Sequence, residues 1–287
     1  MPGTLFVVAT PIGNLEDLTF RALRTLREVD LIAAEDTRRT SRLLAHYEVR
    51  KPLVSLREHN ETRESPRLVE RLARGESIAL VSDAGTPGIS DPGQLLVRTA
   101  REAGIRIVPV PGPSAITAAL SVSGLAGDKG FVFAGFPPSS GSARTSWFED
   151  LQSESRAIVF FEAPHRIRRT GADAASYFVN RPILYVREIS KINEEFVHRP
   201  NTEPDTTLSL PDRGEYVVIV GPLEEAVAEP RISEVANIFG LIAEYVTQDQ
   251  NAAIRATAAI LGLHERQVRK TLKQARFSAK RAEDATS

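Results

Sequence analysis

Residues Ser82–Gly93, with the sequence SDAGTPGISDPG, decide the fold of this 287-residue chain. They follow a short apolar run, Ile78–Val81, and lead into a helix-like pattern over Gln94–Glu102. Three Gly, two Pro and two Asp within twelve residues cannot form a regular element. A connection between a strand and a helix usually takes about two to six residues. We therefore interpret this long segment as a rigid ligand-binding loop at the carboxyl end of a strand, with an ordinary connection as the alternative.

A second loop of the same kind follows one helix later. Arg106–Val110 is predicted to be a strand, and Pro111–Ala115 turns from it into a helical run over Ile116–Val122. Ser114 occupies the position of a helix N-cap, and the amides behind it can bind an anion such as a carboxylate. The segment also half matches the G-x-S-x-G elbow of serine hydrolases. Ile116 replaces the final glycine of that elbow, so we reject a serine nucleophile here.

The composition is that of a soluble globular protein. Hydrophobic residues make up 42% and charged residues 25% of the chain, which has room for about two domains and a small remainder. Zero Cys excludes disulfides, thiolate metal sites and a cysteine nucleophile, and no His pair has metal-ligand spacing, so we predict no metal. The N-terminus lacks a signal-peptide pattern and no stretch approaches a membrane span, which predicts a cytoplasmic protein.

Strand and helix patterns alternate through the first half of the chain. The predicted strands are Leu5–Ala9, Leu31–Ala34 and Leu53–Ser55, and the predicted helices are Phe20–Val29 and Ser41–Tyr47. A further helix is expected to begin at Ser65-Pro66 and to end at Gly75. Together with the two strand–loop–helix units above, this alternation predicts a mainly parallel sheet covered by helices.

The pattern changes after about residue 125. Strands are predicted at Phe131–Ala134, Ala157–Phe161, Ile183–Val186 and Tyr216–Val220, with a helix near Ile167–Phe178 and a flexible connection over Gly135–Arg144. Helical patterns follow at Ile232–Tyr245, Ala252–Leu261 and Glu265–Ala275, with Gly262 between the last two. We therefore divide the chain into an α/β domain over 1–123, a second α/β domain over 124–225 and a small helix-turn-helix-like module over 232–287.

Seven motifs occur in order along the chain: LFVVATPIGNLEDLTFRAL, AAEDTR, SDAGTPGISDPG, PVPGPSA, FFEAPHR, VREISKINEEF and GEYVVIVG. Together they closely resemble the bacterial 16S ribosomal RNA cytidine 2′-O-methyltransferases, a branch of the tetrapyrrole-methylase superfamily, over roughly residues 4–276. The resemblance implies two α/β domains with S-adenosylmethionine in the trough between them, usually in a homodimer. It also implies methylation of a cytidine ribose 2′-hydroxyl in small-subunit ribosomal RNA.

The resemblance also implies which residues of this sequence contact the cofactor. It implies that Ala84, Gly85, Thr86, Pro87 and Ile89 line the cofactor, that Ser114 and Ala115 meet its methionine portion, and that Glu162, Ile189 and Glu215 lie near its adenosine. The chemistry agrees with this set. A zwitterionic amino acid joined to an adenosine needs backbone donors, a helix start and a few apolar walls.

The chemical step would also benefit from a general base, because removing the proton of the weakly acidic 2′-hydroxyl would accelerate methyl transfer. We take Glu188 and Lys191 as the catalytic candidates, although their spacing of three residues also suits a simple ion pair beside a strand end. Glu35 is a further candidate. Asp36 is better explained as the cap of the following helix, and His165 as a hydrogen-bonding residue at a helix start.

The charge is unevenly distributed. Residues 251–287 contain eight Lys or Arg and three acidic residues, a net charge of +5, which leaves −6 for residues 1–250 at a total of −1. The last predicted helix carries its cationic side chains at steps of three and four residues: Arg266, Arg269, Lys270, Lys273 and Arg276. We expect this face to contact RNA phosphates, with a solvated helix face as the alternative.

Three other functions agree with parts of the sequence. A tetrapyrrole C-methylase would share the fold and the cofactor, but it needs no basic C-terminal module. A nicotinamide-dependent dehydrogenase is disfavoured because the first strand-to-helix turn, ATPIGN, lacks G-x-G-x-x-G. A non-catalytic RNA-binding or assembly protein would keep the fold without binding S-adenosylmethionine.

Overall fold

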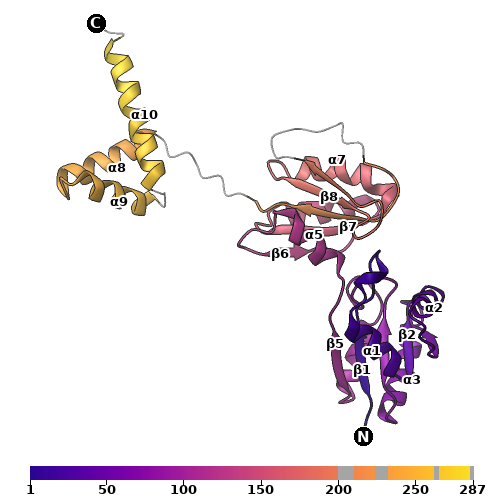
Figure 1. Ribbon diagram of the computed structural model, residues 1–287. Helices are drawn as coiled ribbons and strands as arrows, with labels where there is room; N and C mark the ends of the chain where they lie inside the picture. The colour runs from indigo at the N-terminus through magenta and orange to yellow at the C-terminus, as the bar shows by residue number, and fades with distance from the viewer. Residues whose placement is uncertain (200–209, 224–231, 262–264, 285–287) are drawn as a thin grey trace. The chain divides into compact units, whose positions relative to one another are not determined.

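A computed structural model describes residues 1–199, 210–223, 232–261 and 265–284 of the chain (Figure 1). The chain separates into two compact units, residues 1–223 and residues 224–287. The first unit contains two five-stranded sheets. The described part of the second unit consists of helices. Each unit is considered by itself below.

The first sheet is parallel, as the sequence predicts. Its elements in chain order are β1 (Thr4–Val8), the 3-10 turn η1 (Leu15–Asp17), α1 (Phe20–Glu28), β2 (Leu31–Ala34), α2 (Thr37–His46), β3 (Leu53–Ser55), α3 (Glu61–Ala73), β4 (Ile78–Val81), α4 (Gln94–Glu102) and β5 (Arg106–Val110). The strand order is β3-β2-β4-β1-β5, and every described pair in it is parallel. The loops after β1, β4 and β5 therefore meet at one edge of the sheet.

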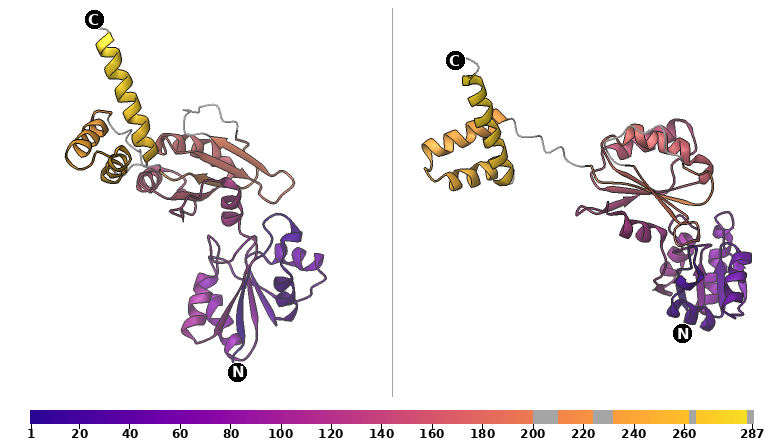
Figure 2. Two further views of the ribbon diagram at one scale, coloured as in Figure 1. Left: turned by 60° about the vertical axis from the view of Figure 1, so that its left-hand side comes forward. Right: turned by 45° about the horizontal axis from the view of Figure 1, so that its top comes forward.

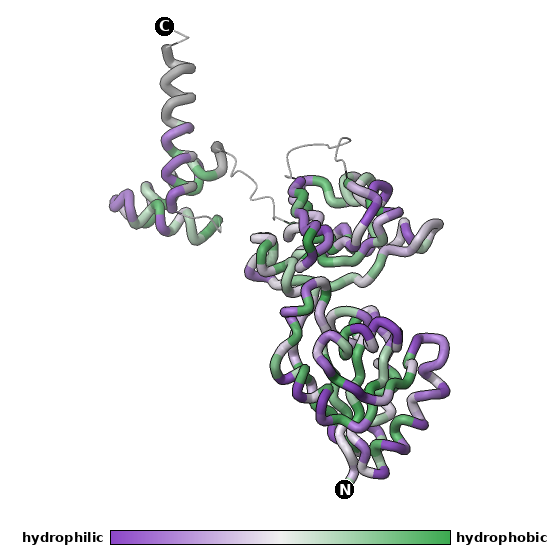
Figure 3. Tube along the Cα trace, turned by 45° about the vertical axis from the view of Figure 1, so that its right-hand side comes forward, coloured by the Kyte–Doolittle hydropathy of each residue, from purple (hydrophilic) through white to green (hydrophobic). Residues whose placement is uncertain are grey.

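Helices cover both faces of this sheet (Figure 2). Leu72 of α3 and Leu96 of α4 pack with Leu5 and Leu80 on one face. On the other face, α1 and α2 pack against β1, β2 and β4, and Ile32 is fully buried there. Each fully buried Leu or Ile contributes roughly 1.5–3 kcal/mol relative to an exposed one. Figure 3 shows hydrophobic stretches of the chain in the interior of this part and more hydrophilic stretches around them. This distribution is expected for a sheet that is buried on both faces.

The second sheet is mixed. Its elements are α5 (Ala115–Ser123), β6 (Phe131–Phe133), α6 (Gly141–Gln152), β7 (Ala157–Glu162), the 3-10 turn η2 (Pro164–Arg166), α7 (Ile167–Tyr177), β8 (Ile183–Arg187), β9 (Glu195–Arg199) and β10 (Tyr216–Val220). The strand order is β6-β7-β10-β8-β9. Only the pair of β6 with β7 is parallel among the described pairs, and the others are antiparallel. The edge strand β9 is absent from the predicted elements.

The connection between the sheets is short. Strand β5 belongs to the first sheet, but α5 packs on the second one, where Ile116, Ala119 and Leu120 contact residues of β7, β8 and β10. The opposite face of the second sheet is covered by α6 and α7. Residues 111–114 therefore lead directly from one sheet to a helix of the other.

Several boundaries differ from the sequence prediction. Helix α2 begins at Thr37 instead of Ser41. Helix α3 begins at Glu61, so Pro66 lies inside it instead of opening it. The earlier start is fixed by a turn at residues 57–61 and by the Glu61 carboxylate, which accepts hydrogen bonds from the amides of Gly93 and Leu95 at the start of α4. The predicted flexible connection 135–144 also ends early, because α6 begins at Gly141 and Arg144 is buried in it.

The second unit contains three described helices, α8 (Ile232–Tyr245), α9 (Gln250–Leu261) and α10 (Glu265–Asp284). They share a small core of Val235, Ile254, Ala258 and Val268. Helix α10 continues beyond its predicted end at Ala275, and the turn expected at Gly262 lies outside the described residues. No described helix of the chain combines the length and the apolar character that crossing a membrane requires.

Candidate functional site

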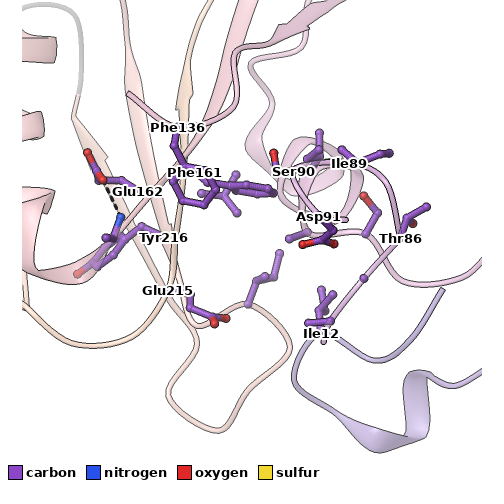
Figure 4. Close-up of a pocket in the computed structure, with 18 of the residues that line it drawn as sticks. Ile12, Thr86, Ile89, Ser90, Asp91, Phe136, Phe161, Glu162, Glu215 and Tyr216 are labelled. Atoms are coloured by element: carbon purple, nitrogen blue, oxygen red, sulfur yellow. Dashed lines mark hydrogen bonds between the residues drawn. The ribbon is translucent and has the colours of Figure 1, made fainter. Parts of the chain in front are cut away.

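A cavity of about 400 Å³ lies between the two sheets, at the carboxyl ends of the strands of the first sheet (Figure 4). Nine of the ten predicted cofactor residues line it: Ala84, Gly85, Thr86, Ile89, Ser114, Ala115, Glu162, Ile189 and Glu215. Pro87 is not among the lining residues and is buried within its loop. Loops that are far apart in the sequence thus line one cavity.

The loop after β4 is held in place by the loop after β1. The Thr10 amide donates a hydrogen bond to the Gly85 carbonyl (2.9 Å), and the Gly85 amide donates one to the Thr10 carbonyl (3.0 Å). Gly85 has a φ of +77°, a conformation that side chains disfavour. Both backbone groups of Gly85 are therefore used within the protein, and Gly85 serves the cavity by its shape.

The start of α5 leaves its backbone donors open. Ser114 is the N-cap residue, as predicted, but its side chain makes no capping hydrogen bond. Ser114, Ala115 and Ile116 all line the cavity. The first-turn amides of a helix have no partner within the helix and carry its positive dipole end. This part of the wall is therefore suited to an anionic group.

Glu162 lines the cavity, but its carboxylate is used elsewhere. The carboxylate accepts hydrogen bonds from the Ala163 amide (2.7 Å) and the Thr170 hydroxyl, and it pairs with Arg166. Arg144 reaches the same cluster and donates to Asp173 and Thr170. The side chain of Glu162 is thus part of the internal framework that holds η2 and α7 beside the cavity. In Figure 4 it points away from Phe161 and the cavity centre.

Glu188 and Lys191 form an ion pair, with 2.8 Å between the Lys191 Nζ and the Glu188 Oε1. Glu215 adds a second carboxylate at 2.9 Å from the Nζ. Burial disfavours the charged ammonium, but the hydrogen bonds to both carboxylates outweigh it and raise the pKa of Lys191. In this arrangement Lys191 keeps its proton at neutral pH and cannot accept one from a hydroxyl. Of the three residues, only Glu215 lines the cavity.

Asp91 is a site residue that the sequence prediction omits. It lines the cavity, and Figure 4 shows it facing the centre beside Ser90. Burial and the nearby Glu35 carboxylate raise the pKa of Asp91 to about 6, against an opposing hydrogen bond with Ser82. No ion pair joins Asp91 to a basic side chain among the described residues. A cationic ligand would find its carboxylate available.

Aromatic side chains supply an apolar wall that the motifs did not indicate. Phe136 and Phe161 both line the cavity, with their ring centroids 5.4 Å apart. Ile12 faces them from the loop after β1 (Figure 4). Phe161 belongs to the quoted motif FFEAPHR and lies near the end of the buried strand β7, so its position was a usable signal. Phe136 lies in the connection that was predicted only as flexible.

The weaker candidates have structural roles or lie outside the cavity. Asp36 caps α2, because its carboxylate accepts a hydrogen bond from the Arg38 amide (2.8 Å). The Glu35 carboxylate accepts one from the Asp83 amide (3.2 Å). His165 is exposed on η2. Within the described ranges no cluster of His, Asp or Glu has the arrangement of a metal site.

Comparison with known proteins identifies the family. Residues 4–205 match the family of Tetrapyrrole (Corrin/Porphyrin) Methylases. The chain belongs to this family. Its methylases take their methyl group from S-adenosylmethionine, so the chain is an S-adenosylmethionine-dependent methyltransferase. The cavity satisfies the needs of that molecule, since the α5 start suits its carboxylate, Asp91 suits its cationic groups and the phenylalanine wall suits its adenine.

Close relatives and solved structures agree with this assignment. The chain is 47% identical over 260 residues to ribosomal RNA small subunit methyltransferase I of Xylella fastidiosa, covering 89% of this chain and 94% of that protein. It is 46% identical to the protein of the same name from Pseudomonas aeruginosa, covering 88% and 92%. The uroporphyrin III C-methyltransferase of Thermus thermophilus shares the fold, with a TM-score of 0.54 at 21% identity over 76% of this chain and 97% of that chain.

Proposed function

We propose that this methyltransferase modifies small-subunit ribosomal RNA and that the acceptor is the 2′-hydroxyl of a cytidine ribose. An RNA substrate is supported by the sequence identity of 46–47% to two ribosomal RNA small subunit methyltransferases, over nearly nine tenths of this chain. The ribose position and the cytidine rest on the seven sequence motifs. The partner is 16S ribosomal RNA or the assembled small subunit. We further propose a cytoplasmic homodimer.

The predicted cofactor residues divide into three walls in this proposal. Ala84, Gly85, Thr86 and Ile89 shape one side, while Pro87 stiffens their loop. Ser114 and Ala115 present the α5 amides to the methionine carboxylate. On the side of the second sheet, Ile189, Glu215 and the backbone after Glu162 border the adenosine. When bound, S-adenosylmethionine supplies an electrophilic methyl group, and the chain's main task is to align the acceptor with it.

Lys191 and Glu188 act on the chemical step through a positioned hydrogen-bond donor. The Lys191 ammonium is held by Glu188 and by Glu215, of which Glu215 lines the cavity. Two of its three N–H donors hold these carboxylates, and the third can donate to the acceptor oxygen while the hydroxyl proton passes to water. Glu188 keeps the ammonium in place, and its own pKa is lowered because the hydrogen bonds from Lys191 and the Glu215 amide outweigh the effect of burial. Neither residue serves as the base in this scheme.

The second unit docks RNA in this proposal. Arg266, Lys270 and Lys273 are exposed on α10, and Arg269 is half exposed while it donates a hydrogen bond to Asn251 (2.8 Å). Such side chains bind phosphates without choosing a sequence. The side chain of Arg276, the fifth cation of the predicted face, lies outside the described residues. The catalytic unit then selects the nucleotide.

Mass spectrometry of the RNA tests the proposal, and two further assays test its rivals. Small-subunit RNA from cells with and without the protein is digested to nucleosides and compared by mass spectrometry. We expect one 2′-O-methylcytidine to disappear with the protein and to return when purified protein and S-adenosylmethionine are added to unmodified subunits. An unchanged RNA, with methyl transfer to a tetrapyrrole, would favour the C-methylase. An absence of S-adenosylmethionine binding by calorimetry would favour the non-catalytic RNA-binding protein.

A further inference from the structure

A second cavity adjoins the cofactor cavity. It measures about 320 Å³ and shares Ile12, Ala84 and Glu215 with its neighbour. Other parts of its wall come from the loop after β1 and from one side of α2. An acceptor atom has to approach within about 3–3.5 Å of the methyl group that it receives. The acceptor must therefore occupy space next to the cofactor cavity, and the second cavity provides such space.

The two cavities differ in charge. Among the described residues, no Lys or Arg lines the cofactor cavity, whereas Arg39, Arg42 and Lys191 line the second one. Lys191 is already held between two carboxylates. Arg39 and Arg42 are exposed and lie three residues apart on α2, so they share one side of that helix.

Both arginines are available to an anion. The Arg39 side chain is 62% exposed, and its pair with Asp83 is 3.4 Å long. Exposed pairs of this kind contribute little stability, so a phosphate can replace the carboxylate. No ion pair in the described part of the chain involves Arg42. Leu15 and Leu43 give the same cavity apolar surface, which suits a ribose and a base.

We propose that this second cavity holds the acceptor nucleotide of a single-stranded RNA segment, with Arg39 and Arg42 contacting its flanking phosphates. The inference rests on the proposed function and adds the place where its substrate binds. Bases in a duplex are stacked and out of reach, so a nucleotide entering a cavity of this size has to be unpaired. The apolar floor contacts the nucleoside, and the arginines fix the register of the chain.

The test uses the full-length protein with Arg39→Ala and Arg42→Ala combined. Arg38→Ala is the matched control, because Arg38 is an exposed arginine on the same helix that does not line the cavity. Thermal unfolding and calorimetry with S-adenosylmethionine establish that each variant is folded and binds the cofactor. The affinity for a single-stranded fragment of small-subunit RNA is then measured between 50 and 200 mM salt, together with kcat and KM for methyl transfer.

We expect the double variant to bind the RNA fragment at least tenfold more weakly than Arg38→Ala, with a raised KM and an unchanged affinity for S-adenosylmethionine. Two lost phosphate contacts should also reduce the slope of log affinity against log salt by about 1.4. Equal RNA affinity and equal salt slope in the double variant and the control would overturn the inference. A parent protein that transfers no methyl to small-subunit RNA would overturn the proposed function instead, while the binding measurement still decides where RNA binds.

Discussion

Asp91 offers the sharpest test of the site, through the substitution Asp91→Asn. Its pKa is raised from 3.8 to about 6, mainly by burial and then by Glu35. A shift of about two units corresponds to about 3 kcal/mol at most, and partial solvent exposure reduces this to roughly 1–2 kcal/mol. The folded state holds the proton more tightly than the unfolded state. The carboxyl group therefore destabilises the free protein at neutral pH.

The sign of the pH dependence follows from this difference. Between about pH 4 and pH 6 the folded state binds more protons, so the contribution of Asp91 to the free energy of unfolding falls as the pH rises. We expect Asp91→Asn to lack this fall. Relative to the parent, the variant should gain roughly 1–2 kcal/mol of stability between pH 4 and pH 7.5, measured by urea denaturation without cofactor.

Cofactor binding should show the opposite trend. A cationic ligand beside Asp91 favours its ionised form and lowers its pKa, so the parent should bind S-adenosylmethionine more tightly as the pH rises through about 6. Calorimetry should show a gain of up to about tenfold per pH unit there. Asp91→Asn should bind more weakly and without this step. Glu215→Gln is the control, because Glu215 lines the same cavity but pairs with Lys191. Identical pH profiles for Asp91→Asn and the parent would refute the reasoning.

Three other substitutions or deletions test separate parts of the molecule. Gly85→Val should abolish S-adenosylmethionine binding, measured by calorimetry. The control Gly88→Val has the same backbone strain, at a φ of +80°, but Gly88 does not line the cavity, so this variant should be destabilised and still bind the cofactor. Normal binding by a folded Gly85→Val protein would show that the cofactor does not bind beside Gly85. Lys191→Ala should lower the single-turnover methylation rate at least tenfold with little change in cofactor affinity, and an equal rate would leave Lys191 with a purely structural ion pair. Deletion of residues 232–287 should spare cofactor binding, weaken RNA binding and flatten its salt dependence, and an unchanged salt slope would exclude the docking role.

Much of the fold could be predicted because the loops and strands carry strong local signals. Gly, Pro and Asp in the segment 82–93 rule out regular structure, and the runs at Leu31–Ala34 and Tyr216–Val220 match their strands. Other features depend on distant contacts. Strand β9, with polar residues among its apolar ones, pairs only because β8 lies beside it. Helix α3 starts before Pro66 because Glu61 binds the start of α4.

The candidate site shows the same division. Nine of the residues that the motifs indicated as cofactor contacts line one cavity, but the motifs did not show what each side chain does there. The pKa of Asp91 depends on Glu35, which follows a different strand. The spacing of Glu188 and Lys191 suggested their pairing. The third member, Glu215, directly precedes β10, the neighbour of the strand β8 that Glu188 and Lys191 follow. Charge coupling between strands cannot be read from local spacing.

The four residues between β5 and α5 have a consequence for affinity. They join the first sheet to the helix that packs on the second, and Ser114 lines the cavity. A ligand bound there therefore contacts the joint between the two sheets. Pro111 and Pro113 limit the conformations of this joint, and Gly112 lies close against Ala9. The joint is thus arranged before any ligand arrives. A ligand therefore does not lose free energy by ordering this segment when it binds. A more flexible segment would weaken binding even if every contact with the ligand were kept.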